Sequence, residues 1–168
     1  MKNKYKELFE GKFTDTYGHQ NISRLEKIGY VISPATYTER LIYQALDKAT
    51  KREKKLKILD LGCGGGHERL NTYGTVYGID ISRESIKNAK KIYPHAIEGD
   101  ITKRLPYKSN FFDVVFCSEV FGHIDKKDKE KFLQEIKRVL MPGGYLVMSA
   151  ETRGNNWMVH VLKSRKLL

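Results

Sequence analysis

From residue 56 to residue 149, short strand-like runs alternate with helical segments at the spacing of β–α–β units. The run at 111–117 is almost entirely apolar, as expected for a strand buried on both faces of a parallel sheet. The alternation predicts an α/β protein whose doubly wound, mostly parallel sheet lies between two layers of helices. Such sheets bind ligands beyond the carboxyl ends of their strands, so functional residues are expected after each strand. The other predicted strands lie at 57–61, 75–80, 96–98 and 145–149.

The segments between and before these strands predict three helices, at 34–49, 82–92 and 128–140, because their apolar residues recur at helical spacing. Ser82 is the expected N-cap of the second helix. A chain of 168 residues suits one domain. Residues 1–33 are polar with scattered aromatic residues and predict a separate N-terminal lead-in, so the core domain is expected at 34–168.

The sequence carries no pattern of a membrane or secreted protein. Its apolar runs are far shorter than the ~20 residues of a membrane span. The charged start is not followed by the apolar stretch of a signal peptide. Cys63 and Cys117 are two lone cysteines that make neither a disulfide framework nor a metal site. We therefore expect a cytoplasmic protein with no membrane partner and no metal.

The net charge of +11 is large for a chain of this length. It suits attraction to nucleic acid, anionic lipid or an acidic substrate. A lysine-rich surface that serves solubility would give the same charge. The lysines are spread along the whole chain and are not interleaved with aromatic residues. This distribution favours the solubility interpretation and leaves nucleic acid as a less favoured partner.

A glycine cluster, Asp-Leu-Gly-Cys-Gly-Gly-Gly at 60–66, ends the first predicted strand. Glycines allow a tight turn and a close approach of the backbone to a ligand. The spacing is not the dinucleotide fingerprint, since His67 stands where its third glycine would be, and the Gly-Lys-Ser/Thr of a P-loop is also missing. The carboxylate of Asp60 would repel a phosphate but suits a cationic ligand. The alternative is a plain glycine-rich turn.

Acidic residues also end the next two predicted strands. Asp80 could accept two hydrogen bonds from a ribose diol, and Ile81 beside it could pack on a flat base. Asp100 could accept from an exocyclic amino group, with the backbone of Ile101 near the ring nitrogens. The local alternatives are that Asp80 helps to cap the following helix and that Asp100 makes an Asx-turn. Three acidic residues at three successive strand ends, one beside a glycine loop, favour a shared ligand.

Together these segments resemble the class I S-adenosylmethionine (SAM)-dependent methyltransferases, particularly those called type 11 or type 25. The resemblance covers roughly residues 35–151 and implies a Rossmann-like three-layer sandwich. It is specific for the superfamily and says nothing of the methyl acceptor. The matching segments are Ile58–Gly66, Val76–Ser82, Glu98–Ile101, Phe112–Ile124 and Leu140–Leu146.

The resemblance also implies a role for each strand end. Asp80 would bind the ribose hydroxyls, and Asp100 with Ile101 would bind the adenine. Ser118 would meet the methionine part of SAM through its backbone. The acceptor side is expected at Glu119 and His123. The methionine end of SAM would be held by Asp60 and by the backbone of the loop residues Gly62, Cys63, Gly64 and Gly66.

Methyl transfer from a sulfonium is an in-line displacement, so the protein chiefly aligns the reactants and excludes water. A base is needed only where the acceptor must lose a proton. His123 is the first candidate, because imidazole titrates near neutrality, and Glu119 is the second. The alternative for His123 is a helix-cap role before Asp125. In this family the N-terminal region often covers the SAM site, which makes Tyr17, His19 and Tyr37 candidate lid residues, although simple packing is favoured for them.

Two departures from the family pattern carry structural expectations. The stretch Gly66–Thr75 is about one turn too short for the usual helix. The tail Thr152–Leu168 has room for one helix but not for the usual C-terminal β-hairpin, so the core is expected to be truncated after the fifth strand. Strand 145–149 would then be an edge, and an apolar edge invites pairing. We expect a homodimer through that edge, or cover by the tail.

The function that the sequence predicts is methyl transfer from SAM to a small-molecule acceptor. Two alternatives stay open. The charge would suit an RNA or protein methyltransferase, although Ser118–Phe121 stands where base-amino methyltransferases carry Asn/Asp-Pro-Pro-Tyr/Phe. The other alternative is a SAM-binding module without turnover, in which the acceptor lobe is missing.

Overall fold

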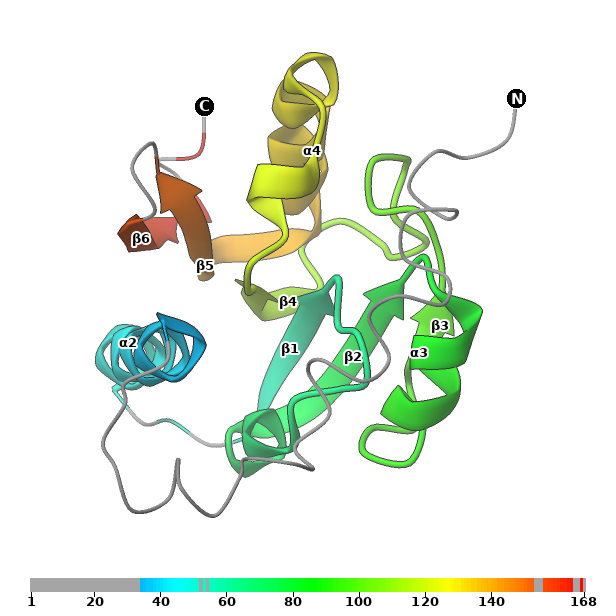
Figure 1. The fold of residues 1–168 in the computed structure, drawn as a ribbon, viewed down its shortest axis with the longest axis horizontal. Coiled ribbons are helices and arrows are strands. Elements are labelled where there is room, and N and C mark those ends of the chain that lie inside the picture. The colour runs from blue at the N-terminus through cyan, green and yellow to red at the C-terminus, as the bar shows by residue number, and fades with distance from the viewer. Residues whose placement is uncertain (1–33, 52, 54, 153–155, 165–166, 168) are drawn as a thin grey trace.

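The computed structural model describes residues 34–51, 53, 55–152, 156–164 and 167. The predicted lead-in at 1–33, with Tyr17 and His19, lies outside the described residues. Tyr37 belongs to helix α2 (Pro34–Thr50). Six strands form one sheet in the order β3-β2-β1-β4-β5-β6 (Figure 1). They are β1 (Leu56–Leu61), β2 (Gly74–Asp80), β3 (Ile97–Glu98), β4 (Phe112–Cys117), β5 (Leu140–Thr152) and β6 (Asn156–Lys163).

The five strands predicted from the sequence pair in parallel, and the sixth pairs antiparallel with β5. The connections contain the 3₁₀ turns η1 (Glu68–Thr72) and η2 (Phe121–His123) and the helices α3 (Arg83–Ala89) and α4 (Lys126–Val139). Ser82 caps α3, since its side chain accepts a hydrogen bond from the Ser85 backbone N–H at 3.2 Å. The predicted α/β class and parallel sheet are confirmed.

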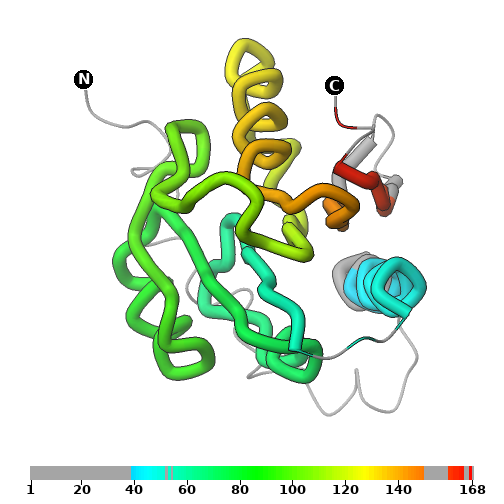
Figure 2. The backbone as a smooth tube through the Cα atoms, turned by 180° about the vertical axis from the view of Figure 1, so that it is seen from behind, coloured from blue at the N-terminus to red at the C-terminus, as the bar shows by residue number. Residues whose placement is uncertain are grey.

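Each face of the sheet has its own apolar cluster, because successive strand side chains point to opposite faces. Ile58 of β1 packs in the cluster that also contains residues of α2, η1 and α3, whereas Leu59 packs in the cluster with α4. Figure 1 and Figure 2 accordingly show α4 on one side of the sheet and α2 and α3 on the other. The predicted three-layer arrangement is confirmed.

The C-terminal tail differs from the prediction. It was expected to hold one helix and no hairpin, but Asn156–Lys163 forms β6 and pairs with β5 from Tyr145↔Lys163 to Thr152↔Asn156. The prediction of a helix is therefore wrong. The physical reason is that β5 presents a row of backbone hydrogen-bonding groups, and pairing with them outweighs the tail's weak helical pattern.

The β5 edge is thus covered by the tail, which was the second of the two expected outcomes. It is not open for a homodimer. β5 is also longer than the predicted 145–149, since the ladder with β4 already begins at Phe112↔Leu140, before an irregularity between Phe112 and Val114. In the described part of the chain, every helix is too short or too polar to cross a membrane.

Candidate functional site

The glycine loop, residues 62–66, leaves β1 and turns over the end of the sheet. The backbone N–H groups of Gly62 and Cys63 donate to the Ile79 carbonyl oxygen at 2.8 and 3.2 Å, which ties the loop to β2. Gly62 and Gly64 have positive φ values of 69° and 51°, where glycine is favoured. A Cβ atom on Gly62 would collide with the Val120 side chain, whereas one on Gly64 would meet nothing within 4 Å. The loop is therefore packed at Gly62 and open at Gly64.

Asp60 lies in β1 beneath this loop and has no exposed surface. Its Oδ2 accepts a hydrogen bond from the Tyr93 hydroxyl at 2.5 Å and lies 3.0 Å from His67 Nδ1. Its Oδ1 has no hydrogen-bond partner among the residues that the structure describes. A buried carboxylate oxygen without a partner is costly, so Oδ1 is a candidate for contact with a ligand.

His67 follows the glycine loop, and its side chain is 27% exposed. Burial disfavours the charged imidazole, but the charge of Asp60 and the hydrogen bond to it raise the pKa of His67 above its ordinary value. The charges of Glu39 and Glu119 act in the same direction. The pairing with Asp60 therefore makes the His67 ring easier to protonate than an isolated imidazole.

Asp80 joins the ends of the first two strands. Its Oδ2 accepts a hydrogen bond from the Gly64 backbone N–H at 2.9 Å, and its Oδ1 accepts from the Ser82 N–H at 2.8 Å. The second contact is the helix-start role that local sequence offered as an alternative. Burial raises the pKa of Asp80, while these two backbone hydrogen bonds oppose the rise. Ile81 beside it is half-buried.

Asp100 lies two residues beyond β3. Its Oδ1 accepts from both the backbone N–H and the hydroxyl of Thr102, at 2.9 and 2.7 Å, so the Asx-type turn considered from the sequence is present. The N–H of the preceding Gly99 donates to the Asp80 carbonyl oxygen at 2.8 Å. Asp100 and Ile101 are each half-buried. The structure thus links the ends of β1, β2 and β3 through Gly64, Asp80 and Gly99.

The end of β4 is held against β5. Ser149 of β5 is fully buried, and its Oγ accepts from the Glu119 backbone N–H at 2.9 Å and lies 3.4 Å from Ser118 Oγ. Glu119 has a positive φ of 61°, which is uncommon for a residue with a side chain. Val120 follows and packs against Gly62. The β4 end and the glycine loop are therefore neighbours.

The two predicted catalytic residues lie beyond this strand end. Glu119 is half-buried and close enough to His67 for its charge to act on that ring. His123 is exposed at the end of η2, and its backbone N–H donates to the Val120 carbonyl oxygen at 2.9 Å. The thiol of Cys63 is buried, and burial raises its pKa. Only the backbone of Cys63 is therefore suited to bind a ligand.

A pocket of about 560 Å³ lies between α2 and η1. The stretch after the glycine loop was expected to be short of a helical turn, and it forms only the five-residue η1. Tyr43 of α2 and His67 are among the lining residues, and the Arg69 guanidinium lies 4.3 Å from the centre of the Tyr43 ring. The other lining residues are Glu39, Glu68 and Thr72.

The site fits the cofactor that the sequence resemblance implies. The unpartnered oxygen of Asp60 and the space at Gly64 provide an acceptor and an approach for a group that carries an ammonium. Asp80 and Asp100 add half-buried carboxylates, which suit hydroxyl and amino groups. Carboxylates at three neighbouring strand ends disfavour a phosphate there, so these acceptors favour a cationic, phosphate-free nucleoside such as SAM. None of the three carboxylates is among the residues that line the pocket between α2 and η1.

Sequence reasoning missed three residues of this site. His67 enters the sequence argument only as a position without glycine, because a histidine seven residues after an aspartate gives no local signal of pairing. Tyr93 is 33 residues from Asp60 in the chain, and no sequence period connects them. Ser149 carried the clearest signal, since it is a polar residue at the end of the apolar run 145–148.

Comparison with known proteins identifies a family for this chain. The family described as "Methyltransferase domain" matches residues 59–148. The 2-methyl-6-phytyl-1,4-hydroquinone methyltransferase of Synechocystis sp. is 37% identical over 100 residues, which cover 55% of this chain and 31% of that protein. The chain spans half or less of the length of the first four curated relatives that it matches.

Solved structures share the fold. The PH0226 protein from Pyrococcus horikoshii is 25% identical with a TM-score of 0.59, over 78% of this chain and 67% of that one. A SAM-dependent methyltransferase from Methanosarcina mazei is 26% identical with a TM-score of 0.52, over 58% of this chain and 53% of that one. The match to the family model covers more than half of the 168 residues. The chain therefore belongs to the methyltransferase domain family, whose cofactor is SAM.

Proposed function

We propose that this chain transfers a methyl group from SAM to a small-molecule acceptor. The observation that supports this most directly is the linkage of three strand ends through Asp80. Its side chain accepts from the Gly64 N–H of the first strand end, and its carbonyl oxygen accepts from the Gly99 N–H of the third. Carboxylates and a glycine loop at neighbouring strand ends suit a single nucleoside ligand.

In this proposal each strand end binds one part of SAM. Asp80 binds the ribose hydroxyls with Ile81 against the base, and Asp100 with Ile101 binds the adenine. Ser118 contacts the methionine part through its backbone. The methionine end is held by Asp60 and by the backbone of Gly62, Cys63, Gly64 and Gly66.

SAM, when bound, supplies a methyl group activated by a positively charged sulfur. The residues of the chain align the acceptor with that group and keep water away from it. His123 is the first candidate to take a proton from the acceptor onto its imidazole, and Glu119 is the second. The exposure of His123 suits a base that faces an incoming acceptor. Glu119 is half-buried and near His67, which suits a residue deeper in the acceptor side of the site.

A small molecule is the favoured acceptor because the named function of the hydroquinone methyltransferase is of that kind. RNA or a protein is the second candidate, and the net charge of +11 is the observation that favours it. Transfer of labelled methyl groups from SAM to separate metabolite, RNA and protein pools distinguishes these acceptors. SAM binding without transfer to any pool would instead support a binding module.

Calorimetric titration with SAM and with its demethylated product, S-adenosylhomocysteine (SAH), tests the cofactor site. The Asp80→Asn variant removes the charge that would bind the ribose and should weaken both ligands at least about tenfold. Asp113→Asn is the matched control, because Asp113 accepts the Lys57 N–H at 2.7 Å at the opposite end of the sheet. Absence of binding of either ligand to the unmodified chain would overturn the proposal.

A further inference from the structure

The glycine loop of this chain lacks the support that a following helix usually provides. In Rossmann-like sheets the first loop leads into a helix whose N-terminal turn holds the loop. Here it leads into η1, which has five residues, and the N-cap residue His67 makes no side-chain capping hydrogen bond. The positive φ values of the glycines do not fix the loop by themselves, because glycine is the most flexible residue. Hydrogen bonds to Ile79 and Asp80 hold the first half of the loop, at Gly62, Cys63 and Gly64. Its far end, at Gly66 and His67, needs a contact of its own.

Tyr93 provides that contact through its hydroxyl group. It lies between α3 and β3, and only 1% of it is exposed. Its hydroxyl oxygen accepts the backbone N–H of His67 at 2.8 Å and donates to Asp60 Oδ2 at 2.5 Å. One hydroxyl group therefore joins the far end of the loop to the strand where the loop begins.

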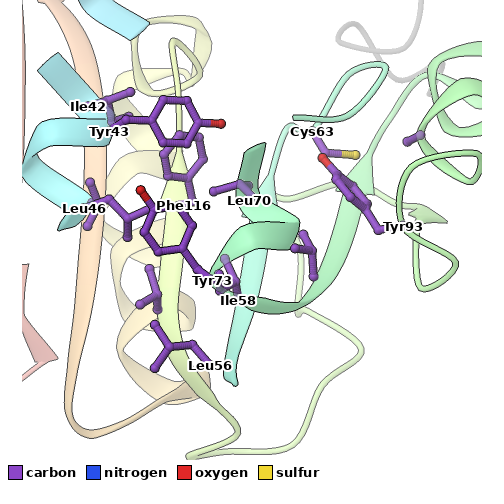
Figure 3. Close-up of a cluster of buried hydrophobic side chains, with 14 of the residues drawn as sticks. Ile42, Tyr43, Leu46, Leu56, Ile58, Cys63, Leu70, Tyr73, Tyr93 and Phe116 are labelled. Carbon is purple, nitrogen blue, oxygen red and sulfur yellow. The ribbon is translucent and has the colours of Figure 1, made fainter. Parts of the chain in front are cut away.

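The ring of Tyr93 also fills the space under the loop. A Cβ atom on Gly66 would lie 3.2 Å from Tyr93 Cζ, and one on Gly78 would lie 2.8 Å from Tyr93 Cε2. Both positions need glycine for this close approach. Figure 3 shows Tyr93 beside Cys63, apart from Tyr73, which lies nearer to Leu46 and Leu56. The loop thus rests on an aromatic ring in place of a helix.

The same hydroxyl sets the orientation of the buried carboxylate. Tyr93 and His67 both contact Oδ2 of Asp60, and Oδ1 is left without a partner among the described residues. A carboxylate held by one oxygen keeps the other for a cationic group. The carboxylate is thus oriented before a ligand arrives, which reduces the ordering that binding requires.

We propose that Tyr93 is a positioning residue that replaces the missing helix as the support of the far end of the glycine loop and of Asp60, and so sets the affinity for the amino-acid end of SAM. The proposal rests on the proposed function for its ligand. It assigns no contact between Tyr93 and SAM. The effect of Tyr93 is exerted through the backbone of the loop and through the Asp60 carboxylate.

Tyr93→Phe tests the hydroxyl group while keeping the ring. SAH carries the amino-acid end, and methylthioadenosine shares its nucleoside part but lacks that end. We expect the variant to bind SAH at least about tenfold more weakly by calorimetry and to bind methylthioadenosine like the unmodified chain. Tyr73→Phe is the matched control, because it also removes a hydrogen bond from tyrosine to aspartate, at 2.6 Å to Asp47, in the same apolar cluster.

Three results would overturn the proposal: unchanged SAH affinity in Tyr93→Phe, equal weakening of both ligands, or an equal loss of SAH affinity in Tyr73→Phe. Amide hydrogen exchange of the unmodified, ligand-free chain tests the proposed loop contact even if Tyr93→Phe does not fold. We expect the His67 amide, which donates to the Tyr93 hydroxyl, to be protected, and exchange at the rate of an unstructured peptide would refute the proposal. If the unmodified chain binds neither ligand, the proposed function fails, and the exchange measurement still tests whether Tyr93 holds the end of the loop.

Discussion

At His67, one ring nitrogen contacts the carboxylate oxygen that also accepts from Tyr93. The ring lies edge-on to Phe116, with 5.5 Å between ring centres, so one side of the imidazole is apolar. Three carboxylates, those of Asp60, Glu39 and Glu119, act on its charge. This residue therefore combines burial, which disfavours its charge, with an acidic surrounding, which favours it more strongly.

A pH dependence follows from that balance. A histidine whose folded pKa is raised above the unfolded value of about 6.5 stabilises the fold fully below that value, and the contribution is lost as pH rises through the folded pKa. His67→Gln should therefore lower the free energy of unfolding by about 1.5–3 kcal/mol at acidic pH and by less at alkaline pH. Urea unfolding of both proteins from pH 6 to pH 9 measures the difference.

Other groups near the site do not obscure this comparison. Asp80 also has a raised pKa, but it is present in both proteins and its contribution cancels in the difference. The charged side chains of Glu68 and Arg69 are likewise common to both. A stability difference that stays constant or grows towards pH 9 would show that the His67–Asp60 pair is not charged in the folded protein.

The side-chain contacts that the sequence could predict are those between residues close in the chain. Asp80 with Ser82 and Asp100 with Thr102 are contacts two residues apart, and short-range turn and cap preferences predict them. The His67 N–H and the Tyr93 hydroxyl are 26 residues apart and belong to different crossovers. Such a contact depends on the packing of a ring under a loop, for which a single sequence holds no periodic signal.

Among the elements, α4 is joined to the segment between β3 and β4 by a compact set of hydrogen bonds. Arg138 donates to the Tyr107 and Leu105 carbonyl oxygens at 2.7 and 3.0 Å and to both carboxylate oxygens of Glu135. Glu135 in turn accepts the Leu105 N–H at 2.9 Å. The planar guanidinium makes these contacts together, which a lysine cannot do.

Arg138→Lys should therefore lower the free energy of unfolding by about 1–3 kcal/mol, because two carbonyl groups and a carboxylate lose their fork-shaped donor. Chemical denaturation measures the loss. Arg83→Lys, on the exposed side of α3, is the control and should stay within about 0.5 kcal/mol of the unmodified chain. Equal stability of the two variants would show that the hydrogen bonds of Arg138 contribute nothing net.

The strands and α3 were predictable because their signals are local: alternation or continuous apolarity, glycine after the strand, and a serine cap. The tail was not, because whether 156–163 forms a helix or a strand depends on the neighbour that it meets. That neighbour is β5, and its pairing groups are supplied by the fold rather than by the tail's own sequence. The shortness of the segment at η1 was visible in the sequence, but the pocket beside it was not.

On the scale of the whole molecule, β6 completes the sheet. It pairs with β5 over eight positions and also lies against α2. A variant that ends at Thr152 would expose the β5 edge again. We expect it to self-associate and to unfold at a lower temperature, with about 2–4 °C lost for each kcal/mol in a chain of this size.

Light scattering after size-exclusion chromatography and thermal unfolding measure both effects. Val161→Lys is the control, because that side chain is 41% exposed and its replacement leaves the backbone ladder intact. This variant should keep the size and the unfolding temperature of the unmodified chain. A chain ending at Thr152 that remains a monomer of unchanged stability would show that β6 is dispensable.

The brevity of η1 has a consequence for remodelling the chain. The crossover from β1 to β2 uses residues 62–73, close to the dozen that a connection between parallel strands requires. Because this crossover is close to the minimum length, a deletion there should break the register of β1 and β2. Insertions should be tolerated, because Arg69, Asn71 and Thr72 are exposed and a longer loop costs little additional closure entropy. The turn is thus a natural graft point for an added helix or a binding peptide.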